Sequence, residues 1–134
     1  MRLLRVVNTG KGRELGTRIG LADHWLARLR GMLAKPEPDA GAGLLLTPCR
    51  SVHMFGMRYP LDVAFLDADG TVVALYPSLS PGSRTGWHRN AVHALELPVG
   101  SLMSTDTQVG DVLSWSLAAE SAASRPDRRM EAVS

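Results

Sequence analysis

The sequence predicts a mostly β protein: a single compact sandwich or small barrel of about seven short strands, with one short α-helix near residues 23–34. Two observations support this fold class. Short apolar or alternating runs, separated by Gly, Pro, Asn and Asp, recur along the chain, and only one segment has apolar residues at helical spacing. The 134 residues, 45% of them hydrophobic, are enough for the core of one domain. We therefore expect one domain over residues 1–117.

The first two strands are expected on either side of a glycine-rich turn at residues 10–12. Residues 3–7 are largely apolar, and residues 15–22 alternate and include β-branched side chains. Asp23 then occupies a suitable N-cap position for the helix expected over 23–34. Prolines just beyond that range end the helix, because proline cannot continue its hydrogen bonds.

The second half of the chain carries mainly strand signals. Asp69-Gly70 predicts a hairpin between the strands before and after it, since glycine readily adopts positive φ. Residues 118–134 contain few large apolar side chains, and we expect them to form a disordered tail. The remaining strands are expected at residues 44–47, 61–67, 71–76, 93–97 and 112–117.

Composition and charge exclude several classes of protein. No apolar run approaches the roughly 20 residues of a membrane span. The N-terminal apolar stretch is short and is interrupted by Arg5, which is unlike a signal peptide, so we expect a cytoplasmic protein. The net charge of +2 divides into +6 over residues 1–60 and −4 over residues 61–134. This division favours complementary charges within one domain over nucleic-acid binding.

One long motif and three flanking pieces resemble a known family. The long motif is residues 53–67 followed by Gly70, and the flanking pieces are Arg30-Gly31-Met32, residues 91–100 and Gly110-Asp111. Together they are similar to the uncharacterised bacterial and archaeal family catalogued as domain of unknown function 192, over roughly residues 13–116. That family commonly has an aromatic residue and an asparagine where this chain has His53 and Gly56. The resemblance implies a single compact β-rich domain and no established activity.

The candidate site is a cluster of polar residues within an otherwise apolar part of the chain. Its members come from the segment 49–62, the strand at 93–97 and the loop 78–90, which has two arginines and an aromatic plane suited to an anionic or stacking ligand. We expect these segments to converge on a polar cleft. The predicted ligand-binding residues are Cys49, His53, Arg58, Asp62, Arg84, Trp87 and Glu96.

Cys49 and His53 have two possible chemical roles. In an extended strand, four residues span about 13 Å, which is too far for both side chains to bind one ion at zinc distances of about 2 Å. We therefore expect neither a metal nor a cofactor. Cys49 could instead act as a nucleophile with His53 as base, although a lone cysteine is more often a small buried hydrophobe.

Asp62 and Glu96 are the two carboxylates of the cluster. Asp62 opens an apolar strand, where a carboxylate either caps backbone N–H groups or pairs with an arginine. The alternation of Leu95, Glu96 and Leu97 predicts a solvent-facing glutamate. If Glu96 instead pointed into a cleft beside Asp62, the two groups would suit acid/base chemistry or cation binding.

The sequence therefore favours a non-enzymatic binding or accessory module that takes an unknown small ligand or protein partner. A small hydrolase-like or acid/base enzyme using Cys49/His53 or Asp62/Glu96 is the first alternative. A structural partner in a larger assembly is the second.

Overall fold

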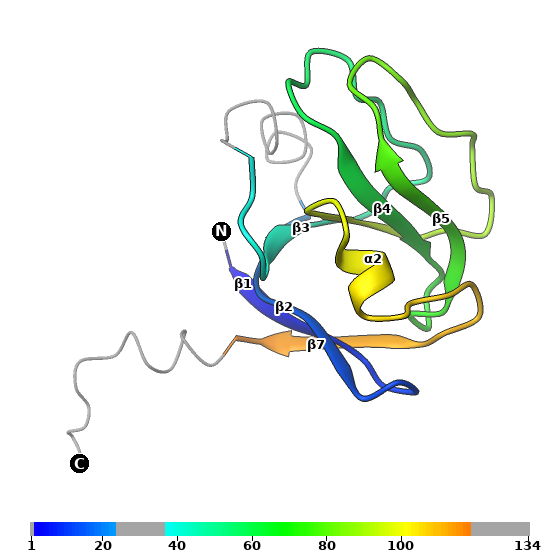
Figure 1. Cartoon of the computed structure of the whole chain (residues 1–134). Coiled ribbons are helices and arrows are strands. Elements are labelled where there is room, and N and C mark those ends of the chain that lie inside the picture. The colour runs from blue at the N-terminus through cyan, green and yellow to red at the C-terminus, as the bar shows by residue number, and fades with distance from the viewer. Residues whose placement is uncertain (1, 24–36, 119–134) are drawn as a thin grey trace.

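The computed structural model describes residues 2–23 and 37–118, and there the chain forms one seven-stranded sheet (Figure 1). The strand order is β5-β4-β6-β3-β2-β1-β7. The predicted mostly β fold is confirmed. The elements are β1 (Leu3–Asn8), β2 (Arg13–Ala22), β3 (Ala42–Leu46), β4 (Leu61–Leu66), β5 (Val72–Leu79), β6 (His93–Leu97), α2 (Ser101–Ser104) and β7 (Leu113–Leu117).

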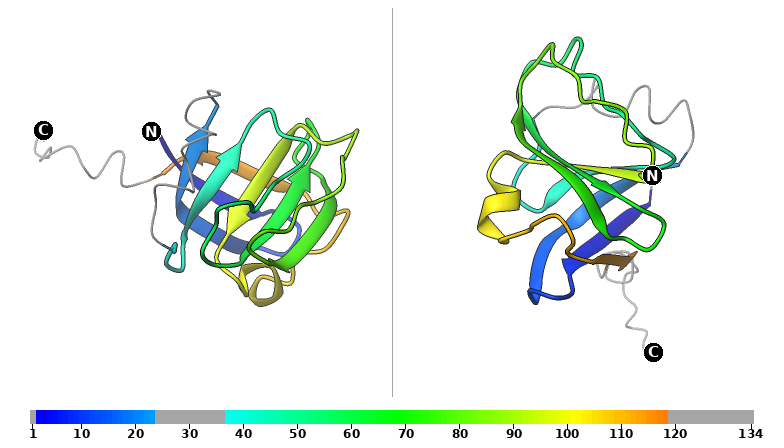
Figure 2. Two further views of the ribbon diagram at one scale, coloured as in Figure 1. Left: turned by 90° about the horizontal axis from the view of Figure 1, so that it is seen from above. Right: turned by 90° about the vertical axis from the view of Figure 1, so that its right-hand side faces the viewer.

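The sheet curls into a half-barrel, with α2 at one open end of the curl (Figures 1 and 2). The two edge strands, β5 and β7, begin close to each other. Val72 N donates to Asp111 O at 2.8 Å, and Leu113 N donates to Gly70 O at 2.9 Å. Gly70 has φ +85°, and a Cβ there would lie 2.3 Å from Leu113 O. Glycine is therefore needed where β5 and β7 approach each other.

The hairpin predicted from Asp69-Gly70 is confirmed, since β4 and β5 pair antiparallel on either side of it. The next strand along the chain, β6, pairs with both β4 and β3 and so lies between them. β2 and β3 run parallel. Most of the helix predicted over residues 23–34 and nearly all of the predicted tail fall outside the described residues.

Two details differ from the prediction. β5 continues through Pro77 to Leu79, which an edge strand tolerates because its outer N–H groups need no ladder partner. The four-residue helix α2 was not predicted, because one buried residue, Leu102, gives no helical periodicity to read.

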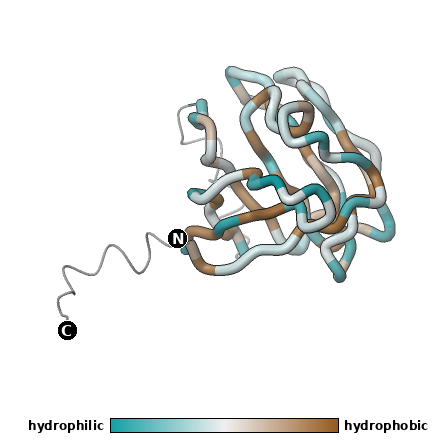
Figure 3. Tube along the Cα trace, turned by 60° about the horizontal axis from the view of Figure 1, so that its bottom comes forward, coloured by the Kyte–Doolittle hydropathy of each residue, from teal (hydrophilic) through white to brown (hydrophobic). Residues whose placement is uncertain are grey.

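Apolar side chains pack on both faces of the sheet, and brown apolar segments run along the strands in Figure 3. We call the two sets the helix-side core and the loop-side core, after what covers them. The helix-side core includes Leu45, Ala64, Leu66, Leu95, Leu97 and, from α2, Leu102. The loop-side core includes Leu44, Leu46, Val52, Met54, Leu61, Val63, Phe65 and Ala94.

Candidate functional site

Two loops of the predicted site lie side by side (Figure 2). We call residues 49–59 and 80–91 the loop pair. Backbone hydrogen bonds join them: Thr85 N donates to Val52 O at 3.0 Å, and Met54 N donates to Ser83 O at 2.7 Å. Val52 N in turn donates to the Thr85 hydroxyl at 3.0 Å. The convergence expected for these two segments is therefore present.

The loop pair has an inner and an outer face. Val52, Met54 and Thr85 are buried, and the first two belong to the loop-side core. His53 and Arg84 form an isolated antiparallel bridge, and both side chains are exposed. Alternate residues therefore anchor the loops on the sheet or face solvent, as in a strand.

An aromatic cluster attaches the second loop to the sheet. His88 Nε2 lies 2.7 Å from the Tyr76 hydroxyl, and the His88 ring lies 4.5 Å, centroid to centroid, from that of Phe65. Phe65 is completely buried in β4. These contacts hold the loop pair at a fixed place over the loop-side core.

Asp62, the predicted carboxylate on β4, is buried and fully engaged with backbone. Its Oδ2 accepts from Gly100 N at 3.1 Å and from Leu102 N at 3.0 Å, at the start of α2. Its Oδ1 accepts from Ser78 N at 2.9 Å. One carboxylate thus ties β4 to β5 and to α2, which is the backbone-capping arrangement, one of the two considered for this position.

Glu96 on β6 is 4% exposed, so the solvent-facing position predicted from alternation is wrong. No described residue forms a hydrogen bond with its Oε1. Burial raises the pKa of this carboxyl from 4.5 to about 7. A buried polar atom without a partner destabilises a fold, so it requires an explanation.

The two carboxylates lie on opposite faces of the sheet. In the β4–β6 ladder, Asp62 pairs with Leu97 and Glu96 pairs with Val63. Paired residues share a face, so Glu96 projects with Val63 toward the loop-side core, whereas Asp62 projects with Leu97 toward α2. They do not form the shared cleft considered from the sequence.

Tyr59 is the titratable neighbour of Glu96 within the loop pair. Burial raises the pKa of its hydroxyl, and the negative charges of Glu96 and Glu37 raise it further. The ring also packs against the loop-side core. Tyr59 therefore lies near two carboxylates, Glu96 and Glu37, and beside the apolar side chains of the loop-side core.

The other predicted site residues lie on the loop pair. The Cys49 thiol donates to Ser51 O at 3.1 Å and packs against the loop-side core. His53, Arg58, Arg84 and Trp87 are all exposed. The loop pair therefore holds five of the seven predicted residues, and Glu96 lies on the sheet face that the loops cover.

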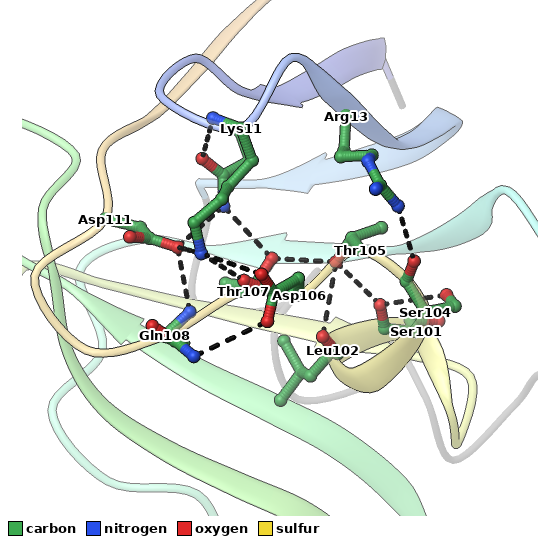
Figure 4. Close-up of polar contacts among 11 residues, drawn as sticks. Lys11, Arg13, Ser101, Leu102, Ser104, Thr105, Asp106, Thr107, Gln108 and Asp111 are labelled. Carbon is green, nitrogen blue, oxygen red and sulfur yellow. Dashed lines mark hydrogen bonds and ion pairs between the residues drawn. The ribbon is translucent and has the colours of Figure 1, made fainter.

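A second polar cluster, which was not predicted, joins the β1–β2 turn to the segment before β7 (Figure 4). Asp111 Oδ2 accepts from Asn8 Nδ2, Lys11 Nζ and Gln108 N at 3.0, 3.0 and 2.9 Å. These contacts, with Asn8 first, lower the pKa of Asp111 to about 2. The Gly110-Asp111 motif was the only sequence signal of this cluster. Its hydrogen bonds explain it as a structural feature.

Two features are absent from the described part of the chain. Among residues 2–23 and 37–118, no group of three His, Cys, Asp or Glu side chains is arranged to hold a metal ion. In the same part of the chain, no helix has the length and hydropathy needed to span a membrane.

Comparison with known protein families identifies the family of this chain. The family model DUF192, described as "Uncharacterized ACR", matches residues 6–115. This chain belongs to the DUF192 family. The family resemblance seen in the central motif is thus confirmed, and the family's description assigns no activity.

Sequence relatives and a solved structure extend the comparison. A UPF0127 protein of Thermococcus sibiricus is 29% identical over 122 residues, covering 88% of this chain and 79% of the relative. A UPF0127 protein of Thermococcus kodakarensis is 32% identical over 114 residues, covering 82% and 72%. The crystal structure of a protein of unknown function from Novosphingobium aromaticivorans matches with a TM-score of 0.71 at 21% identity, covering 84% of this chain and 83% of that one.

Proposed function

We propose that this DUF192 chain is a non-enzymatic binding module for a small molecule that combines a primary amine with an apolar body. The ligand site is the loop-covered face of the sheet around Glu96. The amine donates to Oε1 of Glu96, and the apolar body contacts the loop-side core. This assignment deepens the binding role expected from the sequence.

The unpartnered Oε1 of Glu96 is the observation that carries the proposal. The side chain is 4% exposed, and no described residue donates to this atom. Leu44 and Val63, its partners on the two neighbouring strands, are apolar and offer no side-chain donor. A leucine at position 96 would avoid the free-energy cost of burying an oxygen without a hydrogen-bond partner. The presence of glutamate there despite this cost supports a role in binding.

The chemistry of the surroundings supports an amine. Above a pH of about 7, Glu96 is a buried carboxylate whose Oε1 has no hydrogen-bond donor, and an ammonium group supplies both the hydrogen bond and the opposite charge. The ring of Tyr59 offers a further favourable contact for a cation. Aliphatic side chains of the loop-side core suit the apolar remainder of the ligand.

Thermal unfolding with three small probes tests this assignment. Butylamine, butanol and butyrate share an apolar chain and differ in the head group. We expect butylamine to raise the Tm of the wild-type chain at pH 8 more than butanol does, and butyrate to give no increase. The Glu96→Gln variant keeps the shape and loses the charge, so its response to butylamine should fall to that of butanol.

Asp69→Asn is the matched control, because this exposed carboxylate is replaced by the same amide. It should respond to butylamine as the wild type does. Equal responses of wild type and Glu96→Gln to butylamine, or no response of the wild type, would overturn the proposed site.

A further inference from the structure

The loop pair carries both exposed positive charge and exposed aromatic side chains. Phe55 is 85% exposed and Trp87 is 70% exposed, so both present large aromatic rings to solvent. Four arginines on the same two loops are also exposed. We call the six residues Arg50, Phe55, Arg58, Arg84, Trp87 and Arg89 the arginine–aromatic surface.

No negative charge opposes these arginines along the loops. Residues 48–61 and 77–95 contain no Asp or Glu, although the chain has 13 acidic residues in total. The charges of the arginines are therefore not paired within either loop. Such a surface attracts a partner of opposite charge, and guanidinium groups bind carboxylates through two parallel hydrogen bonds.

The hydrogen bonds of the loop pair separate the two aromatic side chains. Phe55 occupies the turn closed by Met57 N donating to Met54 O at 3.1 Å, where Gly56 has φ +83°. At the other end, His88 N donates to Arg50 O, which places Trp87 near residue 51. Four residues of extended chain, or about 13 Å, therefore separate the aromatics along the ribbon.

From this arrangement, we infer that the arginine–aromatic surface docks an extended acidic segment of a partner protein. A segment of four to five residues spans the distance between Phe55 and Trp87. Its carboxylates pair with the arginines, and its apolar side chains cover the two rings. The surface is separate from Glu96, which projects into the loop-side core on the inner side of the same loops.

Two other anionic partners fit these observations less well. Phe55 and Trp87 lie at opposite ends of the ribbon, whereas insertion into a membrane needs the aromatic side chains gathered at one tip. A single-stranded nucleic acid would pair its phosphates with the arginines and stack its bases on the rings, but a net charge of +2 gives this chain only a weak attraction for a polyanion. The distribution of charge and apolar area thus favours a peptide.

Fluorescence anisotropy on the full chain tests the inference. The probe is a fluorescein-labelled octapeptide of alternating glutamate and leucine, and its control alternates lysine and leucine. We expect binding of the acidic peptide only, weakening as salt rises. Phe55→Ser and Arg84→Ala should each weaken binding by about tenfold, the size expected when an important contact is truncated.

Matched variants separate this surface from general effects. Met103→Ser removes another exposed apolar side chain, 87% exposed on α2, and Arg2→Ala removes another exposed arginine. Both should bind the acidic peptide as the wild type does. No binding of the acidic peptide, equal loss in the control variants, or tighter binding to phosphatidylserine vesicles or oligouridylate would each overturn the inference.

Discussion

Asp62 and Glu96 lie on adjacent strands and are both nearly inaccessible to solvent, at 1% and 4% exposure, yet their surroundings are opposite. Asp62 accepts three backbone hydrogen bonds on the helix-side face. Glu96 has an unpartnered oxygen on the loop-side face. Burial of a carboxylate is stabilising where backbone N–H groups surround it and destabilising where they do not. One face of the sheet thus holds a structural acid, and the other holds the acid that we assign to binding.

The largest loss in the free energy of unfolding is expected from Asp62→Asn. An amide leaves at least one of the three N–H groups without an acceptor, because its NH2 cannot accept a hydrogen bond. We expect a loss of about 4 kcal/mol in the free energy of unfolding, measured by urea denaturation. The exposed Asp69→Asn should change it by less than about 0.5 kcal/mol. A similarly small change in Asp62→Asn would show that the capping contacts are not stabilising.

The next largest effect is the pH dependence that Glu96 imposes on the stability of the fold. Because its folded pKa of about 7 lies above the unfolded value, the folded state binds the proton more tightly. Wild-type stability relative to Glu96→Gln should therefore be highest below pH 4.5, fall as pH rises toward 7 and level off above it. The total change should be about 3 kcal/mol, from urea denaturation at several pH values. A difference between the two proteins that does not vary with pH would contradict the burial of an unpartnered acid.

A smaller loss of stability is expected where the two loops of the loop pair are joined to each other. Thr85→Val removes the hydroxyl that accepts from Val52 N and donates to Gly86 O. We expect a loss of about 1–2 kcal/mol. Hydrogen exchange should accelerate in residues 50–58 and remain unchanged around Asp62. Faster exchange on both faces of the sheet would mean that the two faces do not behave separately. Ser114→Ala, at an exposed position on β7, is the control.

The smallest effect at neutral pH is expected from Asp111→Asn in the cluster of Figure 4. Its folded pKa of about 2 lies below the unfolded value, so Asp111 adds stability above pH 4 that is lost as pH falls toward 2. This slope is opposite in sign to that of Glu96. Acid titration followed by circular dichroism should show the advantage of wild type over Asp111→Asn disappearing near pH 2. An advantage that persists there would contradict the assigned contacts.

Local pattern was sufficient to predict most of the sheet. Short apolar runs, alternation and turn residues identified the seven strands of residues 2–23 and 37–118, and Asp69-Gly70 identified the β4–β5 hairpin. Alternation did not predict the environment of Glu96, because both faces of the central strands are covered: all six residues of β4 are buried. Where both faces are buried, a period of two no longer separates inside from outside.

The candidate site was predictable in its residues but not in its geometry. The sequence indicated that Asp62 could cap backbone N–H groups. Its partners at Ser78, Gly100 and Leu102 lie 16 to 40 residues away, so only the fold identifies them. The same holds for the loop pair, whose contacts join segments about 30 residues apart. Phe55 was not singled out, because exposure at a turn is a property of the folded chain.

The central claim is that Glu96 is a buried acid whose missing partner is an amine. Carbon-13 NMR titration of the glutamate carboxyl groups, with Glu96→Gln used to assign the signal, tests it most directly. We predict that Glu96 titrates near pH 7 in the free protein and that saturating butylamine lowers its pKa. A Glu96 carboxyl that titrates near its ordinary value of 4.5, or one whose pKa butylamine leaves unchanged, would contradict the claim.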